Sequence, residues 1–320
     1  MKTMKKIVLM ALAMVMTVSG CKAGEQTESN EKKTAGGLVR ENREVGNFTG
    51  ISLIGSCRVV CTLDTKASVV VETPKQELEK LQTEVKNGVL TISRKKIAGV
   101  RVIYGKDDER TTVYVTVPTL KKVSLVGSGD IVVKGKVKSD GVLDVSLSGS
   151  GDIEMGDVDA HYVKFSLAGS GDVKVGNVKS PQVELSLAGS GDIAVKSVDA
   201  ELAAVNLAGS GDVQVGLVKA SDVAAVRMAG SGDMTIDRVD CGRLDISQLS
   251  SSDLRLKAVK ATITKVSKSG SGSLWISGTT GAYEKVVRGN GVYDKKLIRQ
   301  TEGRPRTVST SSPNGIEAQP

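Results

Sequence analysis

Hydrophobic and polar residues alternate along most of the chain, and the same alternation returns about every twenty residues. Residues 182–187, for example, read Gln-Val-Glu-Leu-Ser-Leu, so that every second side chain is apolar. An alternation with a period of two is typical of a strand with one buried face, whereas an amphipathic helix has a period of about 3.6. Each copy of the pattern therefore predicts two short strands, one on either side of a glycine-rich tetrapeptide.

The tetrapeptide Gly-Ser-Gly-Asp (GSGD) marks this period. It occurs six times, and its fourth residues are Asp130, Asp152, Asp172, Asp192, Asp212 and Asp233. Two degraded copies follow and end at Asp253 and Ser273, so that the steps between fourth residues are 22, 20, 20, 20, 21, 20 and 20. Apolar residues fill the first and third positions after each fourth residue, in columns that begin at Ile131 and Val133, and the sixth position in most copies. A period this strict predicts a repeated structural unit.

A unit of two strands cannot bury its apolar face alone, but stacked copies share one continuous core. Equivalent strands of neighbouring copies would then pair in parallel at about 4.8 Å. We therefore predict an all-β fold, a right-handed parallel β-helix or β-solenoid with about 20 residues per coil and a tight turn at each GSGD. The alternative, a β-propeller, fits less well because its blades need about forty residues and four strands each.

The rest of the chain divides around this repeat. Residues 21–37 and 301–320 are polar and predict a flexible tether and a disordered tail. Residues 38–120 hold several strand-like stretches and the segment Pro-Lys-Gln-Glu-Leu-Glu-Lys-Leu-Gln-Thr-Glu-Val from Pro74, which predicts one short helix. We interpret them as irregular first coils with a capping helix, continuous with the repeat and a C-terminal cap over residues 121–300.

The first twenty residues predict export. Three lysines precede an apolar run from Ile7 to Val18, which is too short for a membrane span. The run ends in Val18-Ser19-Gly20-Cys21, which resembles the lipobox of bacterial lipoproteins. That resemblance implies a signal peptide over residues 1–20 and acyl groups on Cys21, which would anchor the protein to the outer membrane of the cell envelope, facing the periplasm or exposed at the surface. An ordinary signal peptide with a chance cysteine is the alternative.

Charge and cysteine content narrow the choice of partners. The formal net charge is +8 for the whole chain and falls to +5 once the three lysines of residues 1–20 are removed. This modest surplus, without an arginine-rich helix, gives no reason to expect nucleic acid as a partner.

Cys57 and Cys61 would lie about 13 Å apart in a strand, beyond disulfide reach. We expect these two cysteines and Cys241 to be small buried residues rather than zinc ligands, since His161 is the sole histidine.

The GSGD sequence could form a turn or bind a cation. Glycine adopts positive φ without steric cost, and Ser and Asp side chains accept or donate hydrogen bonds to nearby backbone groups. A calcium ladder would need six to eight oxygen ligands per ion, whereas each copy offers one carboxylate. We therefore predict structural turns and no metal. The two most regular copies are Gly169, Ser170, Gly171, Asp172 and Gly189, Ser190, Gly191, Asp192.

The outward columns of the repeat show no cluster of acids with a base, so we expect no catalytic residues and no cofactor. Trp275, Tyr283 and Tyr293 are the one concentration of aromatic residues, and they would either cap the last coil or contact a ligand. The predicted function is a binding module whose partners are the membrane, through its lipid, and glycans or matrix proteins of a host or neighbouring cell. An envelope scaffold that self-associates, or a carbohydrate-active enzyme, are the alternatives.

Residues 45–290, with the stretch Val-Pro-Thr-Leu-Lys-Lys-Val-Ser-Leu-Val-Gly-Ser-Gly-Asp-Ile from Val117 and the GSGD ladder after it, resemble the GIN-domain family, the head domains of auto-transporter adhesins. The resemblance implies a pectin-lyase-like right-handed β-helix, with Gly-Ser-Gly at the tight turn between two sheets, and a role in adhesion. It implies no catalytic residues. The chain differs from trimeric autotransporters because it has neither a heptad stalk nor a C-terminal β-barrel anchor.

Overall fold

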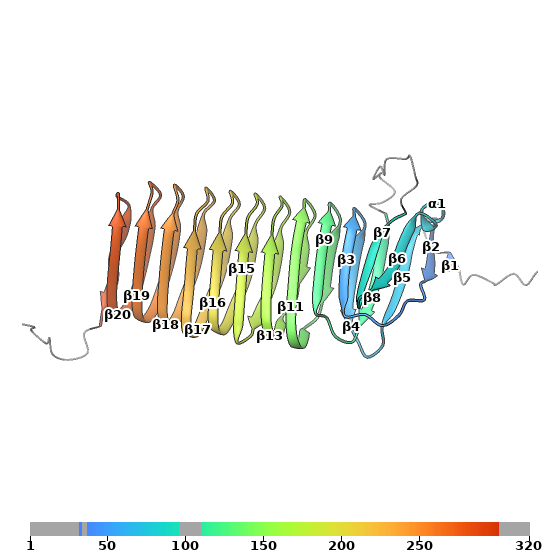
Figure 1. The fold of residues 1–320 in the computed structure, drawn as a ribbon, viewed down its shortest axis with the longest axis horizontal. Helices are drawn as coiled ribbons and strands as arrows, with labels where there is room; N and C mark the ends of the chain where they lie inside the picture. Colours follow the sequence, from blue (N-terminus) through green and yellow to red (C-terminus); the bar gives the residue numbers. More distant parts are fainter. Residues whose placement is uncertain (1–31, 34–36, 96–109, 301–320) are drawn as a thin grey trace, which may run out of the picture.

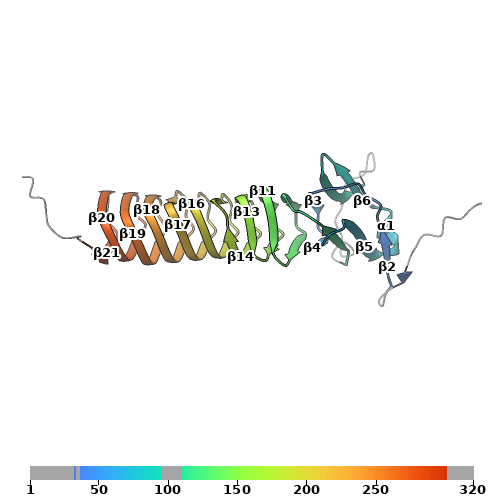
Figure 2. The ribbon, with the colours of Figure 1, turned by 90° about the horizontal axis from the view of Figure 1, so that it is seen from below.

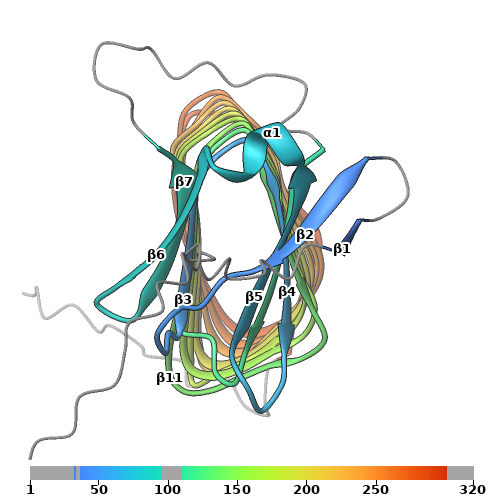
Figure 3. The same ribbon diagram turned by 90° about the vertical axis from the view of Figure 1, so that its right-hand side faces the viewer.

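The computed structural model describes residues 32–33, 37–95 and 110–300. They form a nearly all-β solenoid of about nine turns, with successive turns roughly 20 residues apart (Figure 1). Seen from its N-terminal end, the chain runs up the left side, over the top and down the right side while it recedes from the viewer (Figure 3). This clockwise, receding path makes the coil right-handed. The predicted signal peptide, Cys21, most of the predicted tether and the predicted C-terminal tail lie outside the described residues.

The N-terminal elements are β1 Lys32–Lys33, β2 Leu38–Asn42, β3 Gly50–Gly55, β4 Arg58–Leu63, β5 Ser68–Pro74, α1 Lys75–Leu78, β6 Leu81–Lys86, β7 Val89–Arg94 and β8 Thr112–Val117. The strands of the repeat are β9 Lys122–Gly127, β10 Asp130–Lys134, β11 Val137–Gly149, β12 Ile153–Met155, β13 Val158–Leu167, β14 Val173–Lys179, β15 Gln182–Leu187, β16 Ile193–Leu207, β17 Val213–Met228, β18 Met234–Leu249, β19 Leu254–Ser269, β20 Leu274–Arg288 and β21 Val292–Arg299. From β16 to β20, one long strand bends at the corner opposite the GSGD turn and belongs to both sides of the coil.

Each coil contributes to two sheets that face each other across the core. We call the residues before each turn the leading sheet; it comprises residues 50–55, 122–127, 143–149, 162–167, 182–187, 202–207, 223–228, 243–249, 263–269 and 282–288. We call the residues after each turn the trailing sheet; it comprises residues 58–63, 130–134, 153–160, 173–179, 193–200, 213–220, 234–241, 254–261, 274–280 and 292–299. Both sheets are parallel across the repeat.

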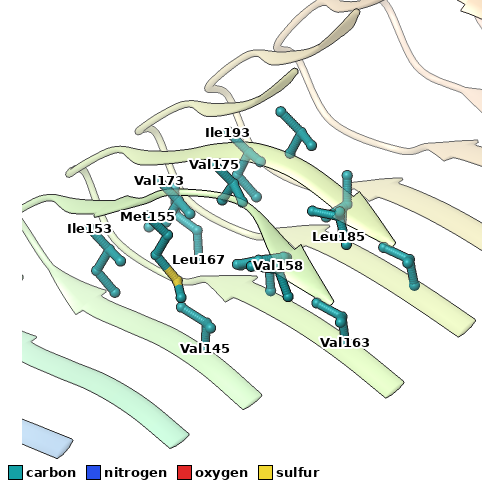
Figure 4. Packing of buried hydrophobic residues seen from close by; sticks show 14 of the residues in the cluster. Val145, Ile153, Met155, Val158, Val163, Leu167, Val173, Val175, Leu185 and Ile193 are labelled. Atoms are coloured by element: carbon teal, nitrogen blue, oxygen red, sulfur yellow. The ribbon is translucent and has the colours of Figure 1, made fainter. Parts of the chain in front are cut away.

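The predicted columns point into the core. Val173 pairs with Ile193 and Ile193 with Val213, so equivalent residues of successive coils lie side by side. All described members of the three columns are at most 6% exposed. Figure 4 shows this stacking for Ile153, Val173 and Ile193. The predicted register is therefore confirmed, and burial of aliphatic side chains along the whole solenoid is its main stabilising contribution.

The three described cysteines belong to the same core. Cys57, Cys61 and Cys241 are buried, and none of them forms a disulfide. Burial raises the pKa of the Cys61 thiol to about 12, so it stays protonated at neutral pH. Small apolar character is therefore what these cysteines contribute.

An additional coil precedes the predicted repeat. Gly55, Ser56, Cys57 and Arg58 form its turn, because β3 pairs with β9 and β4 pairs with β10 in the register of a GSGD copy. Cys57 stands where Gly129 stands in the next coil, and Arg58 pairs with Asp130. The coil of β3 and β4 lies between that of β7 and β8 and that of β9 and β10, so chain order and spatial order differ at this end.

The N-terminal end is closed by antiparallel pairing, which Figure 2 shows beyond the evenly spaced coils. β2 pairs with β5, β5 with β8, and β6 with β7, all antiparallel. The predicted helix is shorter than expected: α1 has four residues, and residues 81–86 form β6. A short helix is only marginally stable in water. The backbone hydrogen-bonding groups of residues 81–86 are paired with β7 instead. With four residues, the single helix of the described chain is far too short to cross a bilayer.

Candidate functional site

The GSGD turns stack on one another through their aspartates. The backbone N–H of Asp192 donates to Oδ1 of Asp172 at 3.1 Å, and that of Asp212 donates to Oδ1 of Asp192 at 2.8 Å. The same bond joins the other pairs of coils from Asp130 to Asp253, and the last one is donated by the N–H of Ser273. Each aspartate thus serves the coil that follows it, which was not foreseen from the sequence.

The turn glycines are required by the close approach of neighbouring coils. A Cβ added to Gly191 would lie 1.9 Å from the carbonyl oxygen of Gly171, and one added to Gly189 would lie 2.0 Å from that of Gly169. None of the four glycines of these two copies, Gly169, Gly171, Gly189 and Gly191, has a φ in the left-handed range, so the predicted reason, a positive φ, is wrong for both copies. The backbone supplies the remaining bonds, since Ser190 N–H donates to Gly169 O at 2.8 Å.

This arrangement makes the GSGD turns, including Gly169 to Asp172 and Gly189 to Asp192, a structural spine. One carboxylate oxygen of each aspartate from Asp130 to Asp253 is already occupied by a backbone N–H. Within the described ranges, no group of three or more His, Cys, Asp or Glu side chains is placed to hold a metal ion. His161 is exposed and lines a separate surface hollow beside Pro181.

An open groove of about 670 Å³ follows the outer face of the trailing sheet, along the axis of the solenoid. It runs from the coil of Glu154 to the coil of Lys257. Its floor is the outward column two positions after each GSGD, where Lys174, Ala194 and Gln214 lie in register. Lys174 and Gln214 are flexible and polar, and Ala194 is small. The groove therefore offers a polar, extended surface rather than an apolar cavity.

The groove continues into a second hollow of about 470 Å³ at the C-terminal end, and Lys257 lines both. Here the same outward column holds Arg255, Trp275 and Tyr293, which pair across the strands β19, β20 and β21. The rings of Trp275 and Tyr293 stack with centroids 5.2 Å apart and planes 10° apart. The Arg255 guanidinium lies 4.7 Å from the centroid of Trp275 on its other side, a favourable cation–π arrangement.

Tyr283 lies apart from this stack, on the leading sheet opposite Thr264. Its hydroxyl donates to Oδ2 of Asp294 at 2.8 Å, and Lys285 pairs with the same oxygen at 2.6 Å. Arg299 lies 5.3 Å from the centre of the Tyr283 ring. Tyr283 packs against the hydrophobic core at this end and the three charged side chains surround it, so the structure separates the three aromatic residues into an outer stack and a cap.

The contacts within the cap shift the pKa values of Asp294 and Tyr283. Burial opposes ionisation of Asp294, but the hydrogen bonds from Lys285 and Tyr283 outweigh it and hold the pKa of this carboxyl below its usual value. Burial, together with the bond to Asp294, raises the pKa of Tyr283, which therefore remains a neutral donor. The cap is a polar group of fixed protonation at neutral pH.

Two buried polar residues beneath the degraded turns were missed by sequence reasoning. The inward column of Leu187 and Leu207 continues through Met228 to Gln248 and Lys268, which are 0% and 1% exposed. Lys268 donates to the carbonyl oxygens of Gly270 at 3.0 Å and Asn290 at 2.9 Å. Gln248 donates to the carbonyl of Ser252 at 2.6 Å. The change from leucine to polar residues in one column was the available signal.

Two basic side chains next to the groove are held in ion pairs. Arg255 bonds Asp253 at 2.7 Å and Asp233 at 3.2 Å, so its guanidinium is neutralised by two carboxylates. Lys257 is paired with Asp237 at 2.7 Å. These pairs orient the stack and the groove wall.

Several solved structures share this fold. A "putative adhesin" from Parabacteroides merdae aligns with a TM-score of 0.59 at 16% identity, over 81% of this chain and 97% of the other. A "putative lipid binding protein" from Parabacteroides distasonis aligns with a TM-score of 0.56 at 20% identity, over 81% and 97%. A "putative adhesin" from Bacteroides fragilis aligns with a TM-score of 0.53 at 19% identity, over 78% and 97%. At these identities the likeness concerns the fold alone.

Sequence comparison is more specific. No protein of curated function matches the chain. A family model described as "Putative auto-transporter adhesin, head GIN domain" matches residues 47–222 and 216–302, which is well over half of the sequence. This match over most of the sequence shows that the chain belongs to the GIN-domain family, which is described as the head domain of auto-transporter adhesins.

Proposed function

We propose that this protein is a lipid-anchored adhesin of the bacterial cell envelope, acylated on Cys21, that binds an extended ligand along the outer face of its trailing sheet. The observation that carries the proposal is the continuous groove, which ends at the stacked rings of Trp275 and Tyr293. A rigid solenoid offers such a surface without any conformational change on binding, which lowers the entropic cost of association. Membership of a family of adhesin heads supports the same assignment.

The two ends of the molecule suit this role. The strands β2 and β5 lie at one end of the solenoid, whereas β20 and β21 lie at the other (Figure 2). A tether that enters at β2 would leave the aromatic stack at the end far from the lipid. Glycans or matrix proteins of a host or a neighbouring cell are the partners that a surface-facing groove of this kind would meet.

The binding test uses the chain from Lys22 to Pro320, purified without lipid, on an array of glycans and matrix proteins. Retention on a defined subset, with no reducing ends or unsaturated sugars released during incubation, is the expected result. Trp275→Ala should weaken retention, whereas Lys164→Gln on the leading sheet should not change it. Turnover of a retained glycan would instead identify a carbohydrate-active enzyme, and retention of no probe at all would contradict the adhesin.

The anchor is tested separately in cells. Cys21→Ser should move the protein from the membrane fraction to the soluble fraction and abolish incorporation of a labelled fatty acid. Protease treatment of intact cells should degrade the wild-type protein if it faces outward. A fractionation pattern that Cys21→Ser leaves unchanged would contradict lipid anchoring.

A further inference from the structure

The C-terminal hollow has features that identify the chemistry of its ligand more narrowly. We infer that the groove binds a linear acidic polysaccharide, and that one of its uronate residues stacks on Tyr293 with its carboxylate beside Lys295 and Lys296. This inference rests on the proposed function, since it names the ligand class of the same groove.

The first argument is the free face of Tyr293. Trp275 covers one face of the Tyr293 ring, and β21 is the last strand among the described residues, so no further coil continues the column there. The Tyr293 side chain is 54% exposed although it ends an ordered stack of planar groups. The face of an aromatic ring is negative and attracts the weakly positive C–H bonds of a sugar ring. A sugar would take the place of the next planar group.

The second argument is the charge around this face. Arg255 and Lys257 also line the hollow, but their charges are matched by Asp233, Asp253 and Asp237, as described above. Lys295 and Lys296 are exposed and make no ion pair with any described carboxylate.

Asp294 is the one acidic residue that lines the C-terminal hollow, and its carboxylate is turned toward Lys285 and Tyr283 in the cap. Two unmatched ammonium groups therefore flank the stack, and they favour an anionic partner.

The third argument is the length of the site. The groove and the hollow together are lined by six basic and three acidic side chains, spread over successive coils. Coils repeat at about 4.8 Å, so the surface offers similar contacts at regular spacing, which suits a repeating polymer. Several weak contacts along one chain add to a much higher affinity than a single sugar would have.

A peptide fits the same surface poorly. From the coil of Glu154 to that of Lys257, each trailing strand is hydrogen-bonded to a neighbour on both sides, for example β16 between β14 and β17, so a peptide could not add as a further strand along this part of the surface. The floor of Ala194, Gln214 and Thr235 provides no apolar depression for a peptide side chain. A polymer recognised by stacking and charge makes better use of these groups.

Trp275 provides a direct readout, because it is the only tryptophan in the sequence. Its emission therefore reports binding at this hollow and nowhere else. The chain from Lys22 to Pro320 is titrated with polygalacturonate and, as a matched neutral probe, with the methyl-esterified polymer. We expect the acidic polymer to change Trp275 emission and to bind about tenfold more tightly than the ester, with affinity falling as salt is raised.

Variants separate the two contacts. Tyr293→Ala and the double change Lys295→Gln with Lys296→Gln should each weaken binding of polygalacturonate by about tenfold. Tyr293→Phe keeps the ring and should bind like the wild type. The matched control, Lys164→Gln with Lys265→Gln on the leading sheet, removes two charges outside the groove and should leave binding unchanged. Melting temperatures of all variants establish that they are folded.

Equal binding of the neutral ester, or full binding by the Lys295→Gln/Lys296→Gln variant, would overturn the acidic-polymer inference. Absence of a Trp275 signal with any acidic polymer would do the same, and retention of another probe on the array would then leave the proposed adhesin intact. If the array also retains nothing, both the ligand class and the adhesin fail.

Discussion

The backbone N–H of Asp172 donates a hydrogen bond to Oδ1 of Asp152, 2.8 Å away in the preceding coil. The carboxylate of each coil accepts a hydrogen bond from the coil after it, so an aspartate is needed wherever another complete GSGD-type turn follows. The last such turn ends at Ser273, and only the partial coil of β21 lies beyond it. A serine can therefore replace the aspartate at this position. Stacked carboxylates repel by about 1 kcal/mol per neighbour in water, and the donated N–H offsets that repulsion.

Removing one carboxylate should loosen the spine locally. We expect Asp192→Ala to lower the free energy of unfolding by about 1–2 kcal/mol, because the N–H of Asp212 loses its acceptor. Asp192→Asn keeps the Oδ1 acceptor and should cost less than half as much. Urea denaturation followed by circular dichroism measures both. Equal losses for Ala and Asn would show that the hydrogen bond contributes nothing.

A methyl group in the turn should be far more damaging. Gly191→Ala places a Cβ 1.9 Å from Gly171 O, which neighbouring coils can relieve only by separating. We expect a loss of about 3 kcal/mol or more, or failure to fold. Gly141→Ala is the matched control, since an added Cβ there has no atom within 4 Å. A Gly191→Ala protein with the melting temperature of the wild type would contradict the stacking geometry.

The inward register predicts a sharp difference between adjacent positions. Val195→Asp buries an unpaired carboxylate in the core and should cost several kcal/mol, as should Val175→Asp. Ala194→Asp introduces the same group one residue away, on the outer face, and should change stability by less than about 1 kcal/mol. The melting temperatures of Val195→Asp and Ala194→Asp measure this difference. Similar melting temperatures would mean that the assigned register is wrong.

Acid should open the C-terminal end. The pKa of Asp294 is lower in the folded protein than in the unfolded chain, so its contribution to stability is complete above the unfolded pKa of about 4. This contribution is lost as pH falls below that value and through the folded pKa. We expect the amide protection factors of residues 282–299, which correct for the intrinsic exchange rate at each pH, to fall below about pH 4, and Asp294→Asn to show the lower protection already at pH 7. Exchange that Asp294→Asn leaves unaltered at pH 7 would contradict the role of the cap.

The sequence predicted the regular part of the fold because one period fixes strand length, register and burial together. It predicted irregular coils over residues 38–120 but did not reveal that Gly55 to Arg58 form a turn in the register of a GSGD copy. Cys57 and Arg58 replace the residues that define the motif, and an insertion of antiparallel strands separates this turn from the next copy. The helix after Pro74 was overestimated, because pairing of β6 with β7 overrides the local helical preference.

The candidate site was only partly predictable. Trp275, Tyr283 and Tyr293 were identified together by proximity along the chain, but Trp275 and Tyr283 lie on different sheets. Trp275 pairs with Tyr293, but the register between β20 and β21 shifts before Ser277, which pairs with Lys296. A strict 20-residue period does not predict this shift. The groove depends on how outward side chains of many coils line up, and no single copy of the repeat encodes it.

The identical contacts between coils also bear on how the protein could vary in length. Val173, Ile193 and Val213 meet their neighbours in the same register, so adding or deleting one twenty-residue copy would leave each remaining interface as it was. Each duplication would move the Trp275–Tyr293 tip about 4.8 Å farther from the N-terminal sheets. Unequal recombination between the near-identical GSGD segments could therefore adjust the reach of the molecule in fixed increments, without inventing a new core.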